Sequence, residues 1–221
     1  MEPISHTDLI LNPDGSIYHL HLLPDDIAET IILVGDPGRV QQVSSHFDSV
    51  EIRKSNREFV AHTGQYRGKR LSVLSTGIGT DNIDIVLNEL DALLNVDLET
   101  RTLKSERKHL KLIRIGTSGA LHSDIPVGSR IVTRIAGGLD GLYHFYNDMN
   151  SVYVTGLAEA FMAYTSWKKS LADPYFIHGS QYLINLFSEP EQVSGITLST
   201  PGFYGPQVRS IRLSPGDSKL I

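Results

Sequence analysis

The chain has 221 residues, which is enough for one α/β domain with a substantial core. Its formal charge of -5 argues against a basic nucleic-acid-binding surface, and the lack of cysteine excludes disulfides and thiolate metal sites. Because no apolar run approaches membrane-spanning length and the N-terminus lacks a signal-peptide pattern, we expect a cytoplasmic protein without nucleic-acid or membrane partners.

The first predicted elements are a strand and a helix. Residues 29–36, "ETIILVGD", read as a buried strand that runs into a glycine-containing turn. Asp36 can cap the following helix and Pro37 suits its first turn, so a helix is predicted through residues 38–47.

A hairpin and a long helix are predicted next. Residues 57–66 and 69–76 flank Arg67-Gly68, as two strands flank a turn. Residues 81–96 give the clearest helical pattern, with apolar side chains at helical spacing on one face. These side chains are Ile83, Val86, Leu87, Leu90 and Leu94.

The second half continues the alternation of strands and helices. The charged residues 97–109 are expected to form a solvated loop or a helix extension. Strands alternating with helices indicate a mainly parallel sheet, whose ligands gather at the carboxyl ends of the strands. The elements predicted here are strands in 110–121 and 129–137 and helices near 156–168 and 178–188, after which residues 194–200 lead into the closing segment.

Glycine-rich turns follow three of the predicted strands. Glycine lets backbone N–H groups approach an anion, arginine offers a bidentate fork, and threonine adds a hydroxyl donor. The spacing fits neither the phosphate loop of nucleoside-triphosphate enzymes nor the dinucleotide fingerprint, so both readings are disfavoured. The turns contain Gly35, Gly38 and Arg39; the stretch "STGIGTDN" at 75–82; and Arg114, Gly116, Thr117 and Ser118.

The ordered set "VGDPGR", "REF", "STGIG" and "RIGTSGAL" resembles the nucleoside phosphorylase family. The later segment "FYGPQVR" resembles the one by which the uridine phosphorylase branch reads uracil, and the similarity runs from about Tyr18 to Arg209. The resemblance implies an α/β fold with a mixed, bent central sheet flanked by helices, in a single domain spanning 1–221. The family's Glu-Met-Glu segment, last strand and last helix have no counterpart after this segment, so the domain is expected to be C-terminally incomplete.

The same resemblance implies roles for individual residues. Phosphate would be bound by the turns after the strands, the base by the "FYGPQVR" segment, and two residues would be donated to the site of a partner subunit. Of these, Thr117, Gln207 and Arg209 are expected to be catalytic. The phosphate-binding residues are Gly35, Arg39, Arg114, Thr117 and the partner-donated Arg57, and the nucleoside-binding residues are Phe203, Gln207, Arg209 and the partner-donated His19.

The implied activity is phosphorolysis of uridine to uracil and ribose 1-phosphate in pyrimidine salvage. Inorganic phosphate would be the co-substrate, with no metal or organic cofactor, in a homodimer or a hexamer built as a trimer of dimers. Arginines would orient phosphate as the nucleophile, and Arg209 would stabilise charge developing on a uracil carbonyl. The amide of Gln207 offers a donor and an acceptor to the imide edge of uracil or a related pyrimidine.

Other readings of these residues remain open. The chain could be a catalytically incomplete homologue that binds nucleoside or phosphate, or that only assembles with other subunits. Phe203 could pack in the core, and Arg209 could form a surface ion pair. His19 and His21 would point to one face of a strand, which is a weak indication of a metal site.

A hydrolase reading is also weak. Asp140 and His144 are close in sequence, but no activated nucleophile accompanies them, so the pattern does not support a Ser-His-Asp triad.

Overall fold

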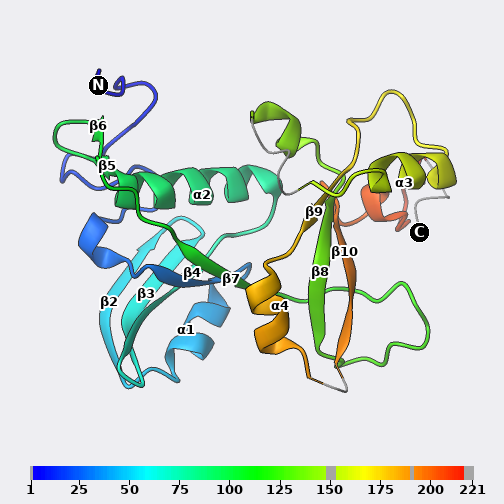
Figure 1. Cartoon of the computed structure of the whole chain (residues 1–221), viewed down its shortest axis with the longest axis horizontal. Coiled ribbons are helices and arrows are strands. Elements are labelled where there is room, and N and C mark those ends of the chain that lie inside the picture. The colour runs from blue at the N-terminus through cyan, green and yellow to red at the C-terminus, as the bar shows by residue number, and fades with distance from the viewer. Residues whose placement is uncertain (1, 148–152, 190–191, 217–221) are drawn as a thin grey trace. The chain divides into compact units, whose positions relative to one another are not determined.

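The computed structural model describes residues 2–147, 153–189 and 192–216. The chain divides into two compact units, Met1–Thr117 and Ser118–Ile221, and each is described by itself (Figure 1). Among the described residues no helix combines the length and the apolar character needed to cross a membrane.

The first unit contains a five-stranded sheet in the order β2-β3-β4-β1-β7. β1 pairs in parallel with β4 and with β7, whereas β2, β3 and β4 form an antiparallel meander, so the sheet is mixed rather than mainly parallel. The predicted first strand, the hairpin and the strand in 110–121 are confirmed, and β2 was not predicted. The strands are β1 (Thr30–Val34), β2 (Ser49–Asn56), β3 (Phe59–Tyr66), β4 (Lys69–Ser75) and β7 (Lys111–Ile115), and a 3₁₀ turn at Pro24–Asp26 precedes β1.

Helices cover both faces of this sheet. Because side chains alternate along a strand, Ile31 and Leu33 of β1 join the larger core beneath α2 (Thr80–Asn95), while Val34 packs with Val40 of α1 (Gly38–Ser44). The predicted long helix is confirmed, although one side chain of its predicted apolar face, Leu87, is exposed. The helix predicted for 38–47 ends earlier, at Ser44. This two-sided packing fixes the sheet between the two helices.

The charged segment after α2 is not a simple solvated loop. β5 (Val96–Asp97) and β6 (Thr102–Leu103) form a short antiparallel ribbon, and Arg101 at its turn is buried. Its guanidinium donates to the carbonyls of Ile4, Ser5 and Leu9, which satisfies the buried cation without a carboxylate. The loop expectation is therefore wrong at this position, because Arg101 ties the N-terminal segment to the ribbon.

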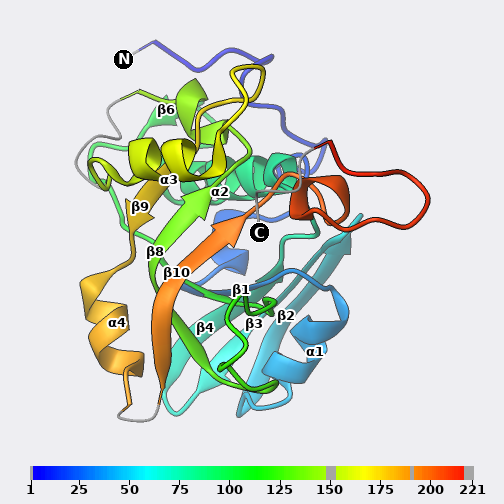
Figure 2. The same ribbon diagram turned by 90° about the vertical axis from the view of Figure 1, so that its right-hand side faces the viewer.

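The second unit contains a three-stranded sheet in the order β10-β8-β9 (Figure 2). β8 pairs in parallel with β10 and antiparallel with β9. The strand in 129–137 and both helices are confirmed, with shorter helices than predicted. β9 and β10 were not predicted, and only the last residue of β9, His178, falls within the predicted helix 178–188. The elements are β8 (Ile131–Gly138), β9 (Tyr175–His178), β10 (Val193–Ser199), α3 (Leu157–Thr165), α4 (Gln181–Phe187), and 3₁₀ turns at Leu142–Phe145 and Gly205–Gln207.

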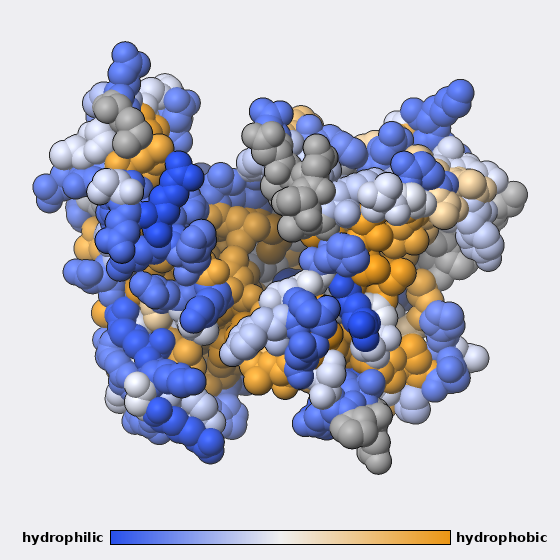
Figure 3. Space-filling view, viewed as in Figure 1, coloured by the Kyte–Doolittle hydropathy of each residue, from blue (hydrophilic) through white to orange (hydrophobic). Residues whose placement is uncertain are grey.

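The core of the second unit is small. Among its described residues the buried apolar side chains are those of Ala158, Phe176 and Ile184. Large apolar side chains such as those of Val127 and Phe145 are exposed, and Figure 3 shows hydrophobic surface over this unit's strands. Most of the apolar burial that stabilises the described chain therefore lies in the first unit.

Stability should depend on pH through the contact between α1 and β3. Ser44 Oγ lies 2.7 Å from Nδ1 of the buried His62, and burial, followed by the positive charge of Arg53, lowers the pKa of His62. As the pH falls below about 6.5, His62 takes up a proton in the unfolded chain before it does so in the folded chain. The contribution of His62 to the free energy of unfolding is therefore fully present above that pH and is lost below it. The thermal midpoint of the wild type should fall more between pH 7.5 and 5.5 than that of His62→Gln. Equal falls in the two proteins would contradict this account.

Candidate functional site

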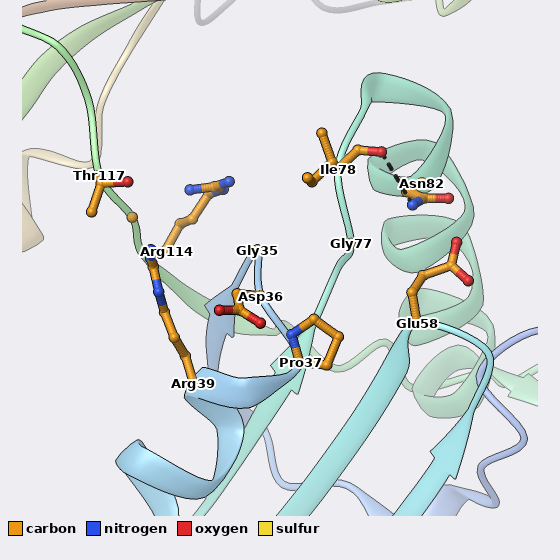
Figure 4. A pocket seen from close by; sticks show the side chains of 11 residues that line it. Gly35, Asp36, Pro37, Arg39, Glu58, Gly77, Ile78, Asn82, Arg114 and Thr117 are labelled. Carbon is orange, nitrogen blue, oxygen red and sulfur yellow. Dashed lines mark hydrogen bonds between the residues drawn. The ribbon is translucent and has the colours of Figure 1, made fainter. Parts of the chain in front are cut away.

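A cavity of about 570 Å³ lies at the carboxyl ends of β1, β4 and β7 in the first unit (Figure 4). Because β1 pairs in parallel with both neighbours, the three glycine-rich turns come together at one edge of the sheet, where the sequence predicted that ligands gather. Gly38 and Ser118 of these turns are not among the lining residues. The cavity is lined by Gly35, Asp36, Pro37, Arg39, Glu58, Gly77, Ile78, Asn82, Arg114, Gly116 and Thr117.

Two guanidinium groups stand on one side of the cavity. Figure 4 shows Arg39 and Arg114 on the same side as Thr117, with Glu58 and Asn82 opposite. None of the ion pairs found among the described residues involves Arg39 or Arg114. Two neighbouring cations without a carboxylate partner repel each other, and an anion with several oxygens would relieve that repulsion through charge-assisted hydrogen bonds.

Glycine leaves room where the turns approach these side chains. A Cβ on Gly116 would collide with Nη1 of Arg114, so the missing side chain leaves room for the guanidinium to fold back over the turn. Gly77 has a φ of +69°, and a Cβ there would lie 2.5 Å from Nδ2 of Asn82 and 2.8 Å from Cγ of Glu58. The shape of the cavity thus depends on two positions that accept no larger residue without displacement.

The start of α1 is fixed by Asp36, whose Oδ1 accepts a hydrogen bond from the Gly38 N–H at 2.8 Å. The N-cap position of α1 is Pro37, which makes no side-chain capping bond, so Asp36 lies one residue before the cap that it was predicted to form. The hydrogen bond from Gly38 to Asp36 holds the turn between Gly35 and Arg39 against the helix that carries the arginine, and so contributes to the position of the Arg39 backbone in the cavity wall.

His19 and Arg57 are not among the residues that line the cavity. They lie together elsewhere on the first unit, where the Arg57 guanidinium stands over the Tyr18 ring at 5.6 Å and the His19 ring meets the same ring edge-on at 4.8 Å. Glu58, the next residue after Arg57, does line the cavity. Consecutive residues of the β2–β3 turn therefore serve two different surfaces, and we call the one formed by Tyr18, His19 and Arg57 the Tyr18 patch.

The strand expected around His19 and His21 is wrong. Residues 18–20 form a turn and His21 has a φ of +54°, so the two side chains do not alternate along a strand. His21 instead contacts Asp14, at 3.1 Å. Within the described part of the chain, no group of three or more histidine, aspartate or glutamate side chains is arranged to hold a metal ion.

The predicted base-reading residues come together in the second unit. The Arg209 guanidinium lies 4.3 Å from the centre of the Phe203 ring, and its Nε donates to Oε1 of Gln207 at 3.2 Å. Gln207 in turn donates from Nε2 to Thr200 Oγ1 at 3.1 Å. The three side chains therefore form a single cluster that presents a ring, an amide and a guanidinium.

The backbone of this cluster is constrained. The N–H groups of Gln207 and Arg209 both donate to the Tyr204 carbonyl, at 3.0 and 2.9 Å, and Val208 between them has a φ of +57°. A β-branched residue in this region is strained, and such strain is concentrated at functional sites. Phe203 is 57% exposed, which rules out the core-packing alternative in the described chain.

The ion-pair alternative for Arg209 finds no support either, since none of the described acidic side chains pairs with it.

Asp140 and His144, which are close in sequence, each form a hydrogen bond with a different partner. Asp140 accepts from Tyr175 Oη at 2.9 Å, whereas His144 Nε2 contacts the Asp173 carbonyl at 2.8 Å.

Sequence reasoning did not single out Glu58, Ile78 and Asn82 as cavity residues. Asn82 donates from Nδ2 to the Ile78 carbonyl at 3.3 Å, which closes the turn at the start of α2. All three residues nevertheless lie in motifs that carry the family resemblance or a glycine-rich turn, because Glu58 belongs to "REF" and the other two belong to "STGIGTDN". Their side-chain types did not suggest anion binding, and only the fold shows that they line the cavity.

A family model described as the phosphorylase superfamily matches residues 29–216. The chain belongs to this superfamily. The matched range covers the three glycine-rich turns of the cavity and the cluster of Phe203, Gln207 and Arg209. The family resemblance seen in the sequence is thereby confirmed.

Relatives of known name lie within the same superfamily. The chain is 32% identical over 196 residues to a uridine phosphorylase of Thermococcus kodakarensis and 29% identical over 197 residues to one of Haemophilus influenzae. These matches cover 89% and 88% of this chain but 59% and 66% of the relatives, so the chain spans less than two thirds of the length of either. A DeoD-type purine nucleoside phosphorylase of Bacillus thuringiensis is 34% identical over 119 residues, which is 53% of this chain and 45% of that protein.

Solved structures share the fold. A nucleoside phosphorylase of Trypanosoma brucei described as showing uridine phosphorylase activity is 29% identical, with a TM-score of 0.74 over 93% of this chain and 72% of that chain. A uridine phosphorylase of Vibrio fischeri is 24% identical, with a TM-score of 0.55 over 84% of this chain and 64% of that chain. The expected α/β fold, with a mixed central sheet flanked by helices, is confirmed.

Replacing either cavity arginine should weaken phosphate binding. Arg39→Ala and Arg114→Ala each remove a charge-assisted donor, which should lower the affinity for inorganic phosphate by about tenfold to a hundredfold. Gly116→Ala should weaken it as well, because the new Cβ displaces the Arg114 guanidinium. Isothermal titration with phosphate measures these effects.

The matched control is Arg107→Ala, which removes the same charge from an exposed position outside the cavity. It should leave phosphate affinity unchanged. If Arg107→Ala weakened binding as much as Arg39→Ala did, general charge rather than the cavity would account for the affinity.

Proposed function

We propose that this chain is a uridine phosphorylase, a pentosyltransferase that cleaves uridine with inorganic phosphate to give uracil and ribose 1-phosphate. The observation that carries the proposal is the cavity with two guanidinium groups, Arg39 and Arg114, that have no acidic partner among the described residues. The similarity of the chain to two uridine phosphorylases also supports the proposal. Phosphate is the co-substrate, and the proposed reaction needs no metal or organic cofactor.

The cavity would supply the nucleophile. Gly35, Arg39, Arg114 and Thr117 would hold phosphate at the edge of the sheet, with its attacking oxygen oriented toward C1′ of the nucleoside. Fixing a dilute anion in this way removes the entropy cost of the encounter from the reaction step. The bound negative charge also favours the oxocarbenium-like sugar that forms as the bond to N1 of uracil breaks.

The cluster in the second unit would read and activate the base. Phe203 offers a ring beside the base and sugar, and Gln207 offers an amide to the imide edge of uracil. Arg209 would stabilise the negative charge that develops on a uracil carbonyl as the base departs. In this assignment Thr117, Gln207 and Arg209 touch the reacting groups and are the catalytic residues.

We further propose that the active site is shared between copies of the chain, in a homodimer or a trimer of dimers. The Tyr18 patch carries both residues expected to be donated, His19 and Arg57, and neither lines this chain's own cavity. The Ile78 side chain, at the cavity, is 93% exposed in the single chain, as expected for a surface that another copy covers.

The remaining assignments follow from the same proposal. The two units would belong to one nucleoside phosphorylase-like domain, since the family match spans both. The protein would act in the cytoplasm, in pyrimidine salvage.

A purine nucleoside is the second candidate substrate, because the chain is also similar to DeoD-type purine nucleoside phosphorylases. That similarity extends over 119 residues, against 196 for the uridine phosphorylase of Thermococcus kodakarensis. The pair of Gln207 and Arg209 matches the polar edge of uracil, which favours the pyrimidine.

Purified protein incubated with uridine and phosphate should release uracil and ribose 1-phosphate. Inosine in place of uridine should give much slower release of its base, and omission of phosphate should abolish turnover. A folded protein that releases no uracil from uridine, or that releases it equally well without phosphate, would overturn the proposed function.

The two halves of the proposed site should respond differently to substitution. Arg209→Ala should lower uridine turnover by about a hundredfold or more, as when a donor to a developing oxyanion is lost, with little change in phosphate affinity. Arg39→Ala should mainly raise the phosphate concentration needed for half-maximal rate. Steady-state kinetics with each substrate varied in turn measures both effects, and equal effects of the two substitutions on both substrates would contradict the assignment.

Subunit mixing should reveal a shared site. Arg57→Ala and Arg114→Ala subunits should each be impaired alone, whereas unfolding and refolding them together should restore about a quarter of the sites in a statistical mixture of dimers. No recovery of uridine turnover in the mixture, with mixed oligomers demonstrated by mass spectrometry, would show that Arg57 serves its own chain.

A further inference from the structure

The Glu89 carboxylate on α2 is almost entirely engaged by the turn that carries His19. Its side chain is 13% exposed, and it accepts from the backbone N–H of His19 at 3.0 and 3.1 Å and from that of Leu20 at 2.8 Å. Its Oε1 also lies 2.5 Å from Nδ1 of the His19 ring. A single acidic side chain therefore holds both the backbone and the ring of this histidine.

The rest of the turn is fixed as well. Asn56 donates from Nδ2 to the His19 carbonyl at 2.8 Å, and Leu20 and Leu22 on either side of His21 are buried. The His19 ring itself remains 27% exposed, and within the described residues its Nε2 has no hydrogen-bond partner. The ring is thus anchored through one nitrogen and leaves the other available at the surface.

We propose that Glu89 is a positioning residue that sets the hydrogen-bonding character of His19. An ionised carboxylate only accepts hydrogen bonds, so the proton of the neutral imidazole resides on Nδ1, and Nε2 is left as an acceptor. His19 then presents a lone pair, at a fixed position, to a hydroxyl group. That this hydroxyl is the 5′-hydroxyl of a nucleoside bound by a partner subunit rests on the proposed function.

Glutamine at position 89 should reverse this arrangement. The backbone N–H groups of His19 and Leu20 require an acceptor, so the single amide oxygen would turn toward them. The –NH₂ group would then face the His19 ring and could be satisfied only by an unprotonated Nδ1. Glu89→Gln should therefore move the proton to Nε2 and convert the outward nitrogen from an acceptor into a donor.

The first measurement is the tautomer of His19, read from long-range proton–nitrogen spectra of protein labelled with ¹⁵N-histidine, with the signal assigned by His19→Asn. The wild type should show the Nδ1–H form and Glu89→Gln the Nε2–H form. A matched control is Asp91→Asn, which removes another carboxylate from α2. Asp91 accepts from the Asn95 amide rather than from the His19 turn, so this substitution should leave the His19 ring unchanged. An Nε2–H ring in the wild type, or no change in Glu89→Gln, would overturn the proposal.

The second measurement is the preference for uridine over 5′-deoxyuridine, expressed as the ratio of the two kcat/KM values. Glu89→Gln and His19→Asn should each lower this ratio by about tenfold, roughly one hydrogen bond, and the double variant should lower it no further. A merely structural role of Glu89 would slow both substrates equally and leave the ratio unchanged, which would overturn the link to sugar recognition.

The two measurements separate this inference from the proposed function. A wild-type protein that turns over neither nucleoside would refute the proposed function and, with it, the role in sugar recognition. The tautomer needs no turnover, so it would still decide whether Glu89 sets the His19 ring.

Discussion

The parallel pairing of β1 with both β4 and β7 is the constraint on which the candidate site depends. Parallel strands end at the same edge, so the turns that begin at Gly35, Thr76 and Gly116 must meet there. The pairing is possible because both faces of β1 are covered, by α2 on one side and by α1 on the other. The packing of the core and the location of the cavity are therefore two consequences of one arrangement.

The charges of the first unit follow from this geometry. Lys54 and Arg70 pair with acidic side chains, whereas Arg39 and Arg114 face a cavity in which Thr117 is the neighbouring hydroxyl. Holding two cations together without an ion-pair partner among the described residues costs stability, and folded proteins retain such costs at binding sites. The His19 turn differs from the cavity, because its polar groups have a partner: the Glu89 carboxylate accepts from the backbone N–H groups of His19 and Leu20 and contacts the His19 ring. An open anion site and a rigidly held histidine on one unit are what a site shared between identical subunits would require.

The sequence was sufficient for the features that depend on local patterns. The strand at 30–34, the hairpin around Arg67-Gly68 and the helix 80–95 follow from hydrophobic spacing and turn residues, and the gathering of the three glycine-rich turns follows from parallel order. Features that depend on distant contacts were not predictable. Arg101 is buried because residues 4–9 supply carbonyl acceptors, and His19 lies in a turn because Glu89, far along the chain, accepts its backbone N–H. The roles of individual site residues remain predictions.

The central claim is that phosphate held by Arg39 and Arg114 is the nucleophile that cleaves a nucleoside. Isotope tracing tests this most directly, with uridine and fully ¹⁸O-labelled phosphate in unlabelled water. The account predicts a ribose 1-phosphate that keeps every labelled oxygen, because a phosphate oxygen forms the new bond to C1′. Free ribose carrying an unlabelled oxygen at C1′ would show that water is the nucleophile, and would contradict the account.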